Sequence, residues 1–241
     1  MHIKLILSTT LLWSLTSFAA ATAGYVPPAS QEPPSDYSRS TGIRSGCLNQ
    51  DESDTLIILA PQSYVGETIS ARPQFIWLMS IPSEIEFRLF EFTANGQVKQ
   101  KGKPILLKST AGINTLSLPN EQPSLTVGNK YLWQVAQRCP NGNNILERAE
   151  FKVVARPSSF NPNLNPKEKI EQYAQKGFWY DALSESLLVS SSGKLGELGS
   201  HLISSLAQSE NPSDTSTLSN NQQIIILKRI ESLEEISSNW R

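Results

Sequence analysis

The sequence predicts a mainly β protein: an immunoglobulin- or fibronectin-like β-sandwich followed by a small helical region. Three observations support this prediction. Short apolar runs separated by turn residues fill residues 51–156, one run has the spacing of a tyrosine corner, and helical periodicity follows a proline-rich linker at 157–166. A chain of this length has room for one moderate domain and a smaller one.

Residues 1–23 are predicted to be an export signal. A short polar start precedes an apolar stretch, and small residues favour cleavage between Ala23 and Gly24. The competing interpretation is a membrane anchor, but serines and threonines interrupt the stretch, which falls short of the roughly 20 continuous apolar residues of a span. We therefore expect an exported protein, periplasmic or extracellular, with no membrane span in the mature chain.

The charge balance and the cysteine content limit the partners and cofactors that this protein is expected to bind. The chain carries 21 basic and 22 acidic residues, a balance that argues against binding nucleic acid or anionic membranes by charge. Its two cysteines, Cys47 and Cys139, would be oxidised after export, and the bond would close a loop of about 90 residues. A redox or metal pair is the alternative, but the C-x-x-C spacing is absent, so we expect a disulfide and neither a metal nor a cofactor.

The leader at 24–50 is predicted to be extended and largely unstructured. It contains Pro27-Pro28 and Pro33-Pro34 among many polar residues. A ligand for a proline-binding domain is the alternative, but bare proline doublets are weak evidence, so a spacer is the simpler interpretation.

The sandwich at 51–156 is predicted from about seven short strands. Residues 85–91 show the clearest alternation, and Asn95-Gly96 predicts a tight turn after them. Trp77 and Trp133 are in phase with apolar neighbours, so they are expected in the core rather than stacked on sugar rings. The expected strands cover residues 56–59, 74–79, 85–91, 98–107, 112–118, 131–136 and 150–154.

One strand organises this prediction. Leu125, Gly128 and Tyr131 form the L-x-x-G-x-x-Y spacing of a tyrosine corner, in which the tyrosine hydroxyl bonds to backbone upstream. Tyr131, Trp133 and Val135 then alternate on one face of the strand, which ends near Cys139.

Helical periodicity begins after the linker, in a hairpin region at 167–208. Gly177 followed by Trp179 and Ala182 resembles the middle of a tetratricopeptide unit, but only one such unit is visible, so we expect a small helical appendage. The apolar positions of three helices are Ile170, Tyr173 and Ala174; Trp179, Ala182, Leu183 and Leu187; and Leu195, Leu198, Leu202 and Leu206.

A flexible linker at 209–221 and an amphipathic helix at 222–241 complete the chain. Two hypotheses explain the apolar face of this last helix: it binds a partner, or it docks onto the other helices, which we favour. The candidate partner-binding residues are Trp179, Tyr180, Ile226, Ile230, Leu233 and Trp240.

The ordered motifs of the mature chain resemble a family of exported cyanobacterial proteins called domain of unknown function 928. The resemblance implies export and this architecture, and it implies no activity. Departures are the missing glycine run before Thr41, Leu-Met-Ser after Trp77, and the tail beyond Ser209. The motifs are Gly24-Tyr-Val-Pro27-Pro28, Thr41-Gly-Ile-Arg44, Leu59-Ala-Pro61, Gly66-Glu-Thr68, Pro73-Gln-Phe75-Ile-Trp77, Gly112-Ile113, Leu118-Pro119, Leu125 to Cys139, Tyr173-Ala174 and Gly177 to Leu183.

No grouping in the sequence predicts catalysis. His201, the one histidine of the mature chain, lies four residues after Glu197 on a predicted helix, a spacing typical of a solvated contact. Glu84, Glu86 and Glu91 are glycosidase candidates by residue type only, and no nucleophile elbow, phosphate loop or zinc motif is present. We expect a non-catalytic module that binds an envelope or secreted protein. A carbohydrate-binding sandwich is the alternative, and a hydrolase is a remote one.

Overall fold

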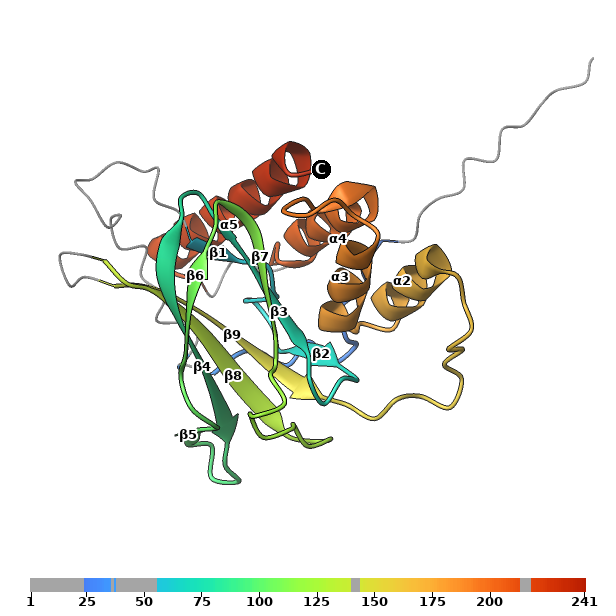
Figure 1. Ribbon diagram of the computed structural model, residues 1–241, viewed down its shortest axis with the longest axis horizontal. Helices are drawn as coiled ribbons and strands as arrows, with labels where there is room; N and C mark the ends of the chain where they lie inside the picture. Colours follow the sequence, from blue (N-terminus) through green and yellow to red (C-terminus); the bar gives the residue numbers. More distant parts are fainter. Residues whose placement is uncertain (1–23, 36, 38–55, 140–143, 213–217) are drawn as a thin grey trace, which may run out of the picture.

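The computed structural model describes residues 24–35, 37, 56–139, 144–212 and 218–241. In this part of the chain two β-sheets pack face to face, and four helices follow them in sequence, three beside the sheets and the last across their upper end in the view of Figure 1. The helices and strands hold similar numbers of residues, so the prediction of a mainly β fold is too narrow and the chain is mixed α/β. The predicted signal and most of the predicted leader lie outside the described residues.

Each sheet has a simple order. The three-stranded sheet runs β1-β3-β7, and the six-stranded sheet runs β2-β9-β8-β4-β5 with β6 also paired to β4. All pairs are antiparallel except β2 with β9. The strands are β1 (Leu56–Ile58), β2 (Gly66–Thr68), β3 (Gln74–Met79), β4 (Ser83–Phe92), β5 (Val98–Gln100), β6 (Ile105–Ser109), β7 (Gly112–Ser117), β8 (Lys130–Gln137) and β9 (Ile145–Val153).

The expected strands are present, with three differences. The expected strand 98–107 is two strands, β5 and β6, because Gly102 turns the backbone with φ 75° and Pro104 has no amide hydrogen to donate. The last strand begins at Ile145 rather than 150. Strand β2 was not predicted, since three residues at a sheet edge give no alternation to detect.

Aromatic rings fill the space between the sheets. Trp77 and Trp133 have no exposed surface, and the Phe75 ring centroid lies 5.0 Å from that of Trp133 and 4.8 Å from that of Phe87. Trp77 donates its indole hydrogen to the Ser109 hydroxyl at 3.1 Å, which satisfies its buried polar atom. The core interpretation of both tryptophans is confirmed, and neither can stack on a sugar.

The tyrosine corner is also confirmed. The hydroxyl of Tyr131 accepts the backbone N–H of Thr126 at 2.9 Å, and Gly128 supplies the intervening turn with φ 91°. Leu125, upstream of the turn, is buried. The corner therefore fixes the approach of the chain into β8.

The helices match the periodicity of the sequence. Asn165 and Ser219 each form a capping box, with Glu168 and Gln222 respectively, and these boxes fix where α2 and α5 begin. Among the described helices, none combines the length and apolar character that crossing a membrane requires. The helices are α2 (Pro166–Gln175), α3 (Trp179–Leu188), α4 (Gly196–Ser209) and α5 (Asn220–Asn239).

Residues 24–35 of the predicted extended leader have no regular structure, but they are held against the fold. This segment has no helix or strand, yet Tyr25 is 5% exposed and its ring lies edge-on to Trp179 at 4.8 Å. The amide of Val26 donates to the carbonyl of Ala174, and the carbonyl of Glu32 accepts the amide of Val65. Hydrogen bonds and an aromatic anchor thus hold an extended chain that has no regular structure of its own.

Candidate functional site

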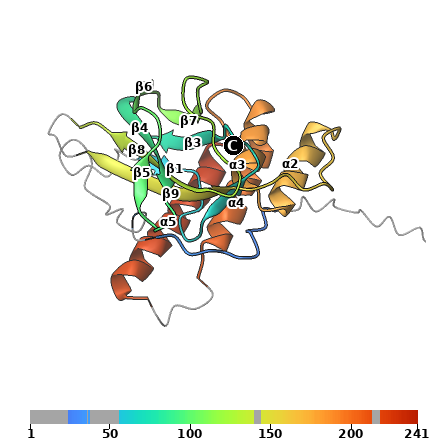
Figure 2. The same ribbon diagram turned by 90° about the horizontal axis from the view of Figure 1, so that it is seen from below.

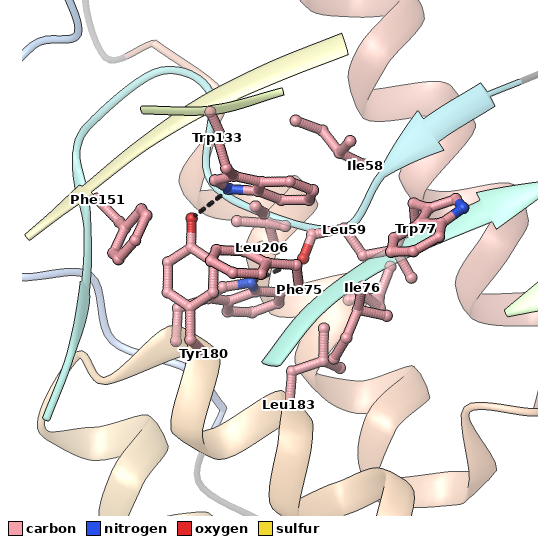
Figure 3. Packing of buried hydrophobic residues seen from close by; sticks show 14 of the residues in the cluster. Ile58, Leu59, Phe75, Ile76, Trp77, Trp133, Phe151, Tyr180, Leu183 and Leu206 are labelled. Carbon is pink, nitrogen blue, oxygen red and sulfur yellow. Dashed lines mark hydrogen bonds between the residues drawn. The ribbon is translucent and has the colours of Figure 1, made fainter. Parts of the chain in front are cut away.

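Helix α3 joins the helices to the sheets through two aromatic side chains. Tyr180 accepts the indole hydrogen of Trp133 at 3.0 Å, and Trp179 donates its own to the carbonyl of Leu59 at 2.9 Å (Figure 3). The Tyr180 ring also packs 5.1 Å from that of Phe151. Trp179 is 0% and Tyr180 3% exposed, so their interpretation as partner-binding residues is wrong. They bind the chain's own sheets.

The next residue of α3 places a carboxylate in the same junction. Asp181 accepts the amide of Ile69 at 3.0 Å and a hydrogen bond from the Thr68 hydroxyl. Burial raises the pKa of Asp181 to about 6, although these two bonds oppose the shift. Since Thr68 is 0% exposed, Asp181 satisfies polar groups that would otherwise be buried without a partner.

A small cavity lies beside Asp181. Its volume is about 150 Å³, and its lining is mostly polar, with Tyr173, Gln74 and Ser184 among the residues. The Ser184 hydroxyl donates to Gln74 at 3.0 Å across it. Because a water occupies about 30 Å³ of liquid, the cavity suits a few waters rather than a substrate.

A second buried carboxylate ties α4 and α5 to the first sheet. Glu210, directly after α4, is 3% exposed and accepts the amide of Gln62 at 2.6 Å. Arg229 of α5 lies 3.5 Å from it and donates to the carbonyls of Ile58 and Ala60 at 2.7 and 3.1 Å. Burial raises the pKa of Glu210, and the Arg229 charge opposes that shift. Glu210 belongs to the predicted flexible linker at 209–221, but this residue is buried and fixed by its hydrogen bond to Gln62.

Helix α5 has two halves that differ in their surroundings. In the inner half, residues 229–239, Leu233 and Ile236 are 0% and 3% exposed and belong to the common core. In the outer half, residues 220–228, no side chain is buried, and Figure 2 shows this end of α5 extending beyond the sheets. Ile224, Ile225 and Leu227 of the outer half are 51%, 43% and 61% exposed.

The structure therefore divides the predicted partner-binding residues of α5. Leu233 is buried and cannot contact a partner, while Ile230 and Trp240 are half-buried against the core. Ile226 is half-buried in the outer half. The most exposed aliphatic side chains of α5, Ile224, Ile225 and Leu227, were not selected from the sequence, because heptad spacing identifies the face that docks.

The predicted disulfide, the predicted cleavage site and the candidate catalytic residues lie in separate parts of the chain. Cys139 lies just after β8 with 8% exposure, but Cys47 and Ala23 lie outside the described residues, so the disulfide and the cleavage site stay predictions. Gly24 is the first described residue. Of the candidate catalytic residues, His201 is exposed on α4, and Glu86 pairs with Arg138 at 2.8 Å on the outer face of β4. Within the described ranges, no three His, Cys, Asp or Glu residues gather as metal ligands would.

A larger cavity opens at the far end of the six-stranded sheet. It has a volume of about 890 Å³ and lies between the β4–β5 turn and residues 128–130. Glu91 receives hydrogen bonds there from Lys101 at 2.9 Å and Asn129 at 2.6 Å. These bonds hold the pKa of Glu91 below its usual range, even though burial would raise it.

The sequence did not identify three polar residues that join the helices to the sheets: Asp181, Glu210 and Arg229. Arg229 gave a signal: it precedes Leu233 by one helical turn and so lies on the apolar face of α5. Asp181, between Tyr180 and Ala182, was noted only within the family motif. Nothing in the sequence around Glu210 distinguishes it from a solvated glutamate.

Comparison with known proteins gives a family match and distant similarity to solved structures. None of the curated proteins matches the chain. Among solved structures, the chain is similar to CopC from Methylosinus trichosporium OB3b, with 14% identity over 44% of this chain and 100% of that chain, at a TM-score of 0.27. The family described as Domain of Unknown Function (DUF928) matches residues 39–195, which is more than half of the sequence. The chain therefore belongs to the DUF928 family.

Proposed function

We propose that this chain is an exported, non-catalytic protein that binds a protein partner through the outer half of α5. One observation carries the proposal: Ile224, Ile225 and Leu227 expose large aliphatic side chains within a single turn of a helix that projects from the body. Isolated exposed aliphatics need no explanation, but three together favour an interaction surface.

The charge pattern of α5 supports the same proposal. Residues 220–227 contain no charged side chain, whereas the rest of the helix begins with Lys228 and contains three glutamates. The centres of protein interfaces are depleted in charge in the same way. A short apolar helical surface without charge suits a groove on another protein, which is a common mode of peptide recognition.

The surroundings of the candidate catalytic residues support the absence of a reaction. His201 is exposed on α4, and Glu86 is held between Arg88 and Arg138. The two carboxyls with raised pKa values in the junction, Asp181 and Glu210, each accept a backbone amide from a distant segment, and the hydroxyl that Asp181 also accepts belongs to the fully buried Thr68. Each carboxylate joins a helical segment to a segment next to a β-strand, Asp181 to Ile69 and Glu210 to Gln62.

The strand order supports an immunoglobulin-like sandwich as the finer description of the fold. If β1, β3 and β7 are strands A, B and E, then β4, β8 and β9 are C, F and G, and each set lies in its expected sheet. Strands β5 and β6 then form an interrupted C′ strand beside β4, and the corner at Tyr131 falls at the start of strand F.

The experiment that tests the function is a differential capture from the exported fraction of the source cells. The wild-type chain is compared with I224N/I225N/L227N and with a control, L106N/V127N, whose residues lie on β6 and in the turn before β8 and are 62% and 55% exposed. Quantitative mass spectrometry should show a protein that the wild type and the control retain equally and that the α5 variant loses.

Thermal unfolding of the three chains should give the same midpoint, because every substituted residue is already exposed. Equal recovery of all captured proteins by the α5 variant would overturn the proposal. Loss from both variants would point to general apolar adhesion and would overturn it as well.

A further inference from the structure

We propose that the 890 Å³ cavity at the end of the six-stranded sheet is a binding site for an uncharged, hydroxyl-rich oligosaccharide. Its volume falls within the roughly 300–1,000 Å³ of small-molecule sites. It lies on the sheets, away from the helices, and none of its lining residues belongs to α5, so the site is separate from the proposed protein contact.

Three lysines line the cavity, Lys99, Lys101 and Lys130; Lys99 is exposed, and the other two are paired with carboxylates. Lys101 binds Glu91 at 2.9 Å, and Lys130 binds Glu150 at 3.3 Å and Glu32 at 3.1 Å. An anionic ligand would have to compete with these carboxylates for Lys101 and Lys130. A neutral ligand with many hydroxyl groups can instead share hydrogen bonds with both partners of each pair, since lysine donates and carboxylate accepts.

Neutral hydrogen-bonding groups and glycines complete the lining. The amides of Asn129 and Gln100 offer donors and acceptors to sugar hydroxyls, and both side chains line the cavity. At Gly96 and Gly128 an added Cβ would meet no atom within 4 Å, so the rim is open there. Such a rim admits a chain of rings rather than a single enclosed one.

An aromatic wall distinguishes this cavity from a simple polar hollow. Phe92 lines the cavity at the end of β4 and is half-buried, with the Lys130 ammonium over its ring at 4.4 Å from the centroid. The Tyr37 ring lies 6.2 Å from the Phe92 ring, next to the lining residues. Tyr37 is 42% exposed. The C–H faces of a pyranose pack well on aromatic rings, so the part of Phe92 that Lys130 leaves open can supply the apolar contact that the buried tryptophans cannot.

Hydrogen bonds within the protein already orient the carboxylates at the cavity, Glu91 and Glu150, without a ligand. Glu91 accepts hydrogen bonds from Lys101, Asn129 and the hydroxyl of Tyr131, the last at 3.2 Å. Glu150 is 1% exposed and accepts the amide of Ser35 at 2.9 Å, which ties the amino-terminal segment to the rim of the cavity. Preordered polar groups lower the entropic cost of binding.

Isothermal titration calorimetry of the full mature chain tests the proposal. The probes are cellotetraose and chitotetraose as uncharged saccharides, tetragalacturonate as an acidic one, and sodium sulfate as a simple anion. We expect an uncharged tetrasaccharide to bind and sulfate not to bind. The F92A variant should weaken binding about 10-fold through loss of the aromatic contact.

Two further variants keep the test independent of folding. A94W places a large ring in the cavity from the exposed turn at Ala94 and should abolish binding, while K108A on β6, outside the cavity, should bind like the wild type. No binding of either uncharged saccharide would overturn the proposal. Binding of tetragalacturonate or sulfate alone, or unchanged affinity in A94W, would overturn it too.

Discussion

The two halves of α5 share one helix but differ in what their side chains contact. In the inner half, Leu233 and Ile236 face the body and are buried, and the outward row continues with Glu231 and Glu235, both exposed. In the outer half, the same outward row is occupied by Leu227, which is 61% exposed. The inner half thus follows the pattern of an ordinary surface helix, apolar inside and charged outside. The outer half does not.

Arg229 marks the boundary between the halves. Its guanidinium donates to two carbonyls at the end of β1 and lies beside Glu210. Amino-terminal to it, no side chain of α5 is buried. The comparison shows that folding explains the apolar residues of the inner half, while those of the outer half need another explanation, which we propose is a partner.

Removal of the boundary charge should have the largest effect on stability. In R229M, Glu210 keeps its buried position but loses its cation, and the carbonyls of Ile58 and Ala60 lose their donor. A broken buried pair costs several kcal/mol, so we expect the free energy of unfolding to fall by about 3 kcal/mol or more. Urea denaturation measures it. The double variant R229M/E210Q should recover part of the loss, and an R229M chain as stable as the wild type would contradict this role.

The pair Leu233 and Leu227 compares the halves directly. L233A deletes a fully buried side chain and should cost about 2–4 kcal/mol, since a cavity remains. L227A removes an exposed one and should change the free energy of unfolding by less than about 0.5 kcal/mol. The same urea measurement on both variants checks this contrast. Equal losses would mean that the outer half is docked in solution.

The buried carboxyl of α3 gives the junction a pH dependence that the outer half of α5 lacks. The folded pKa of Asp181, about 6, lies above its ordinary value of 3.8, so the folded state binds the proton more tightly. Its contribution to stability is full below pH 3.8 and is lost as the pH rises through 6. Between pH 4.5 and 7 the wild type should lose about 2 kcal/mol more than D181N, measured by denaturation at each pH. Parallel profiles would contradict the burial of this carboxylate.

The smallest expected effect concerns the amides of α5 rather than its side chains. In native-state hydrogen exchange, residues 220–228 should exchange before residues 229–239, because helix without tertiary packing opens with little cost. We expect protection in the outer half to be at least about 10-fold lower, corresponding to about 1.4 kcal/mol. Uniform protection along α5 would remove the distinction between the halves.

The sequence was sufficient for elements whose periodicity or turn chemistry is local. Alternation located β3, β4 and β8, apolar spacing located the helices, and the corner at Tyr131 followed from three residues within a short span. The junction could not be predicted, because it joins side chains far apart in the chain, such as Asp181 with Ile69 and Gln62 with Glu210. Whether an apolar residue such as Trp179 serves the core or a partner depends on these distant pairings, and periodicity alone cannot decide between the two.

Site-specific photocrosslinking in the source cells tests the central claim most directly. A benzophenone amino acid is placed at Ile225 in the outer half of α5 and, as a matched control, at Leu106 on β6, both exposed aliphatic positions. We predict a crosslink to one discrete protein from position 225 and none from position 106. The absence of a crosslink at 225, or the same adducts from both positions, would contradict it.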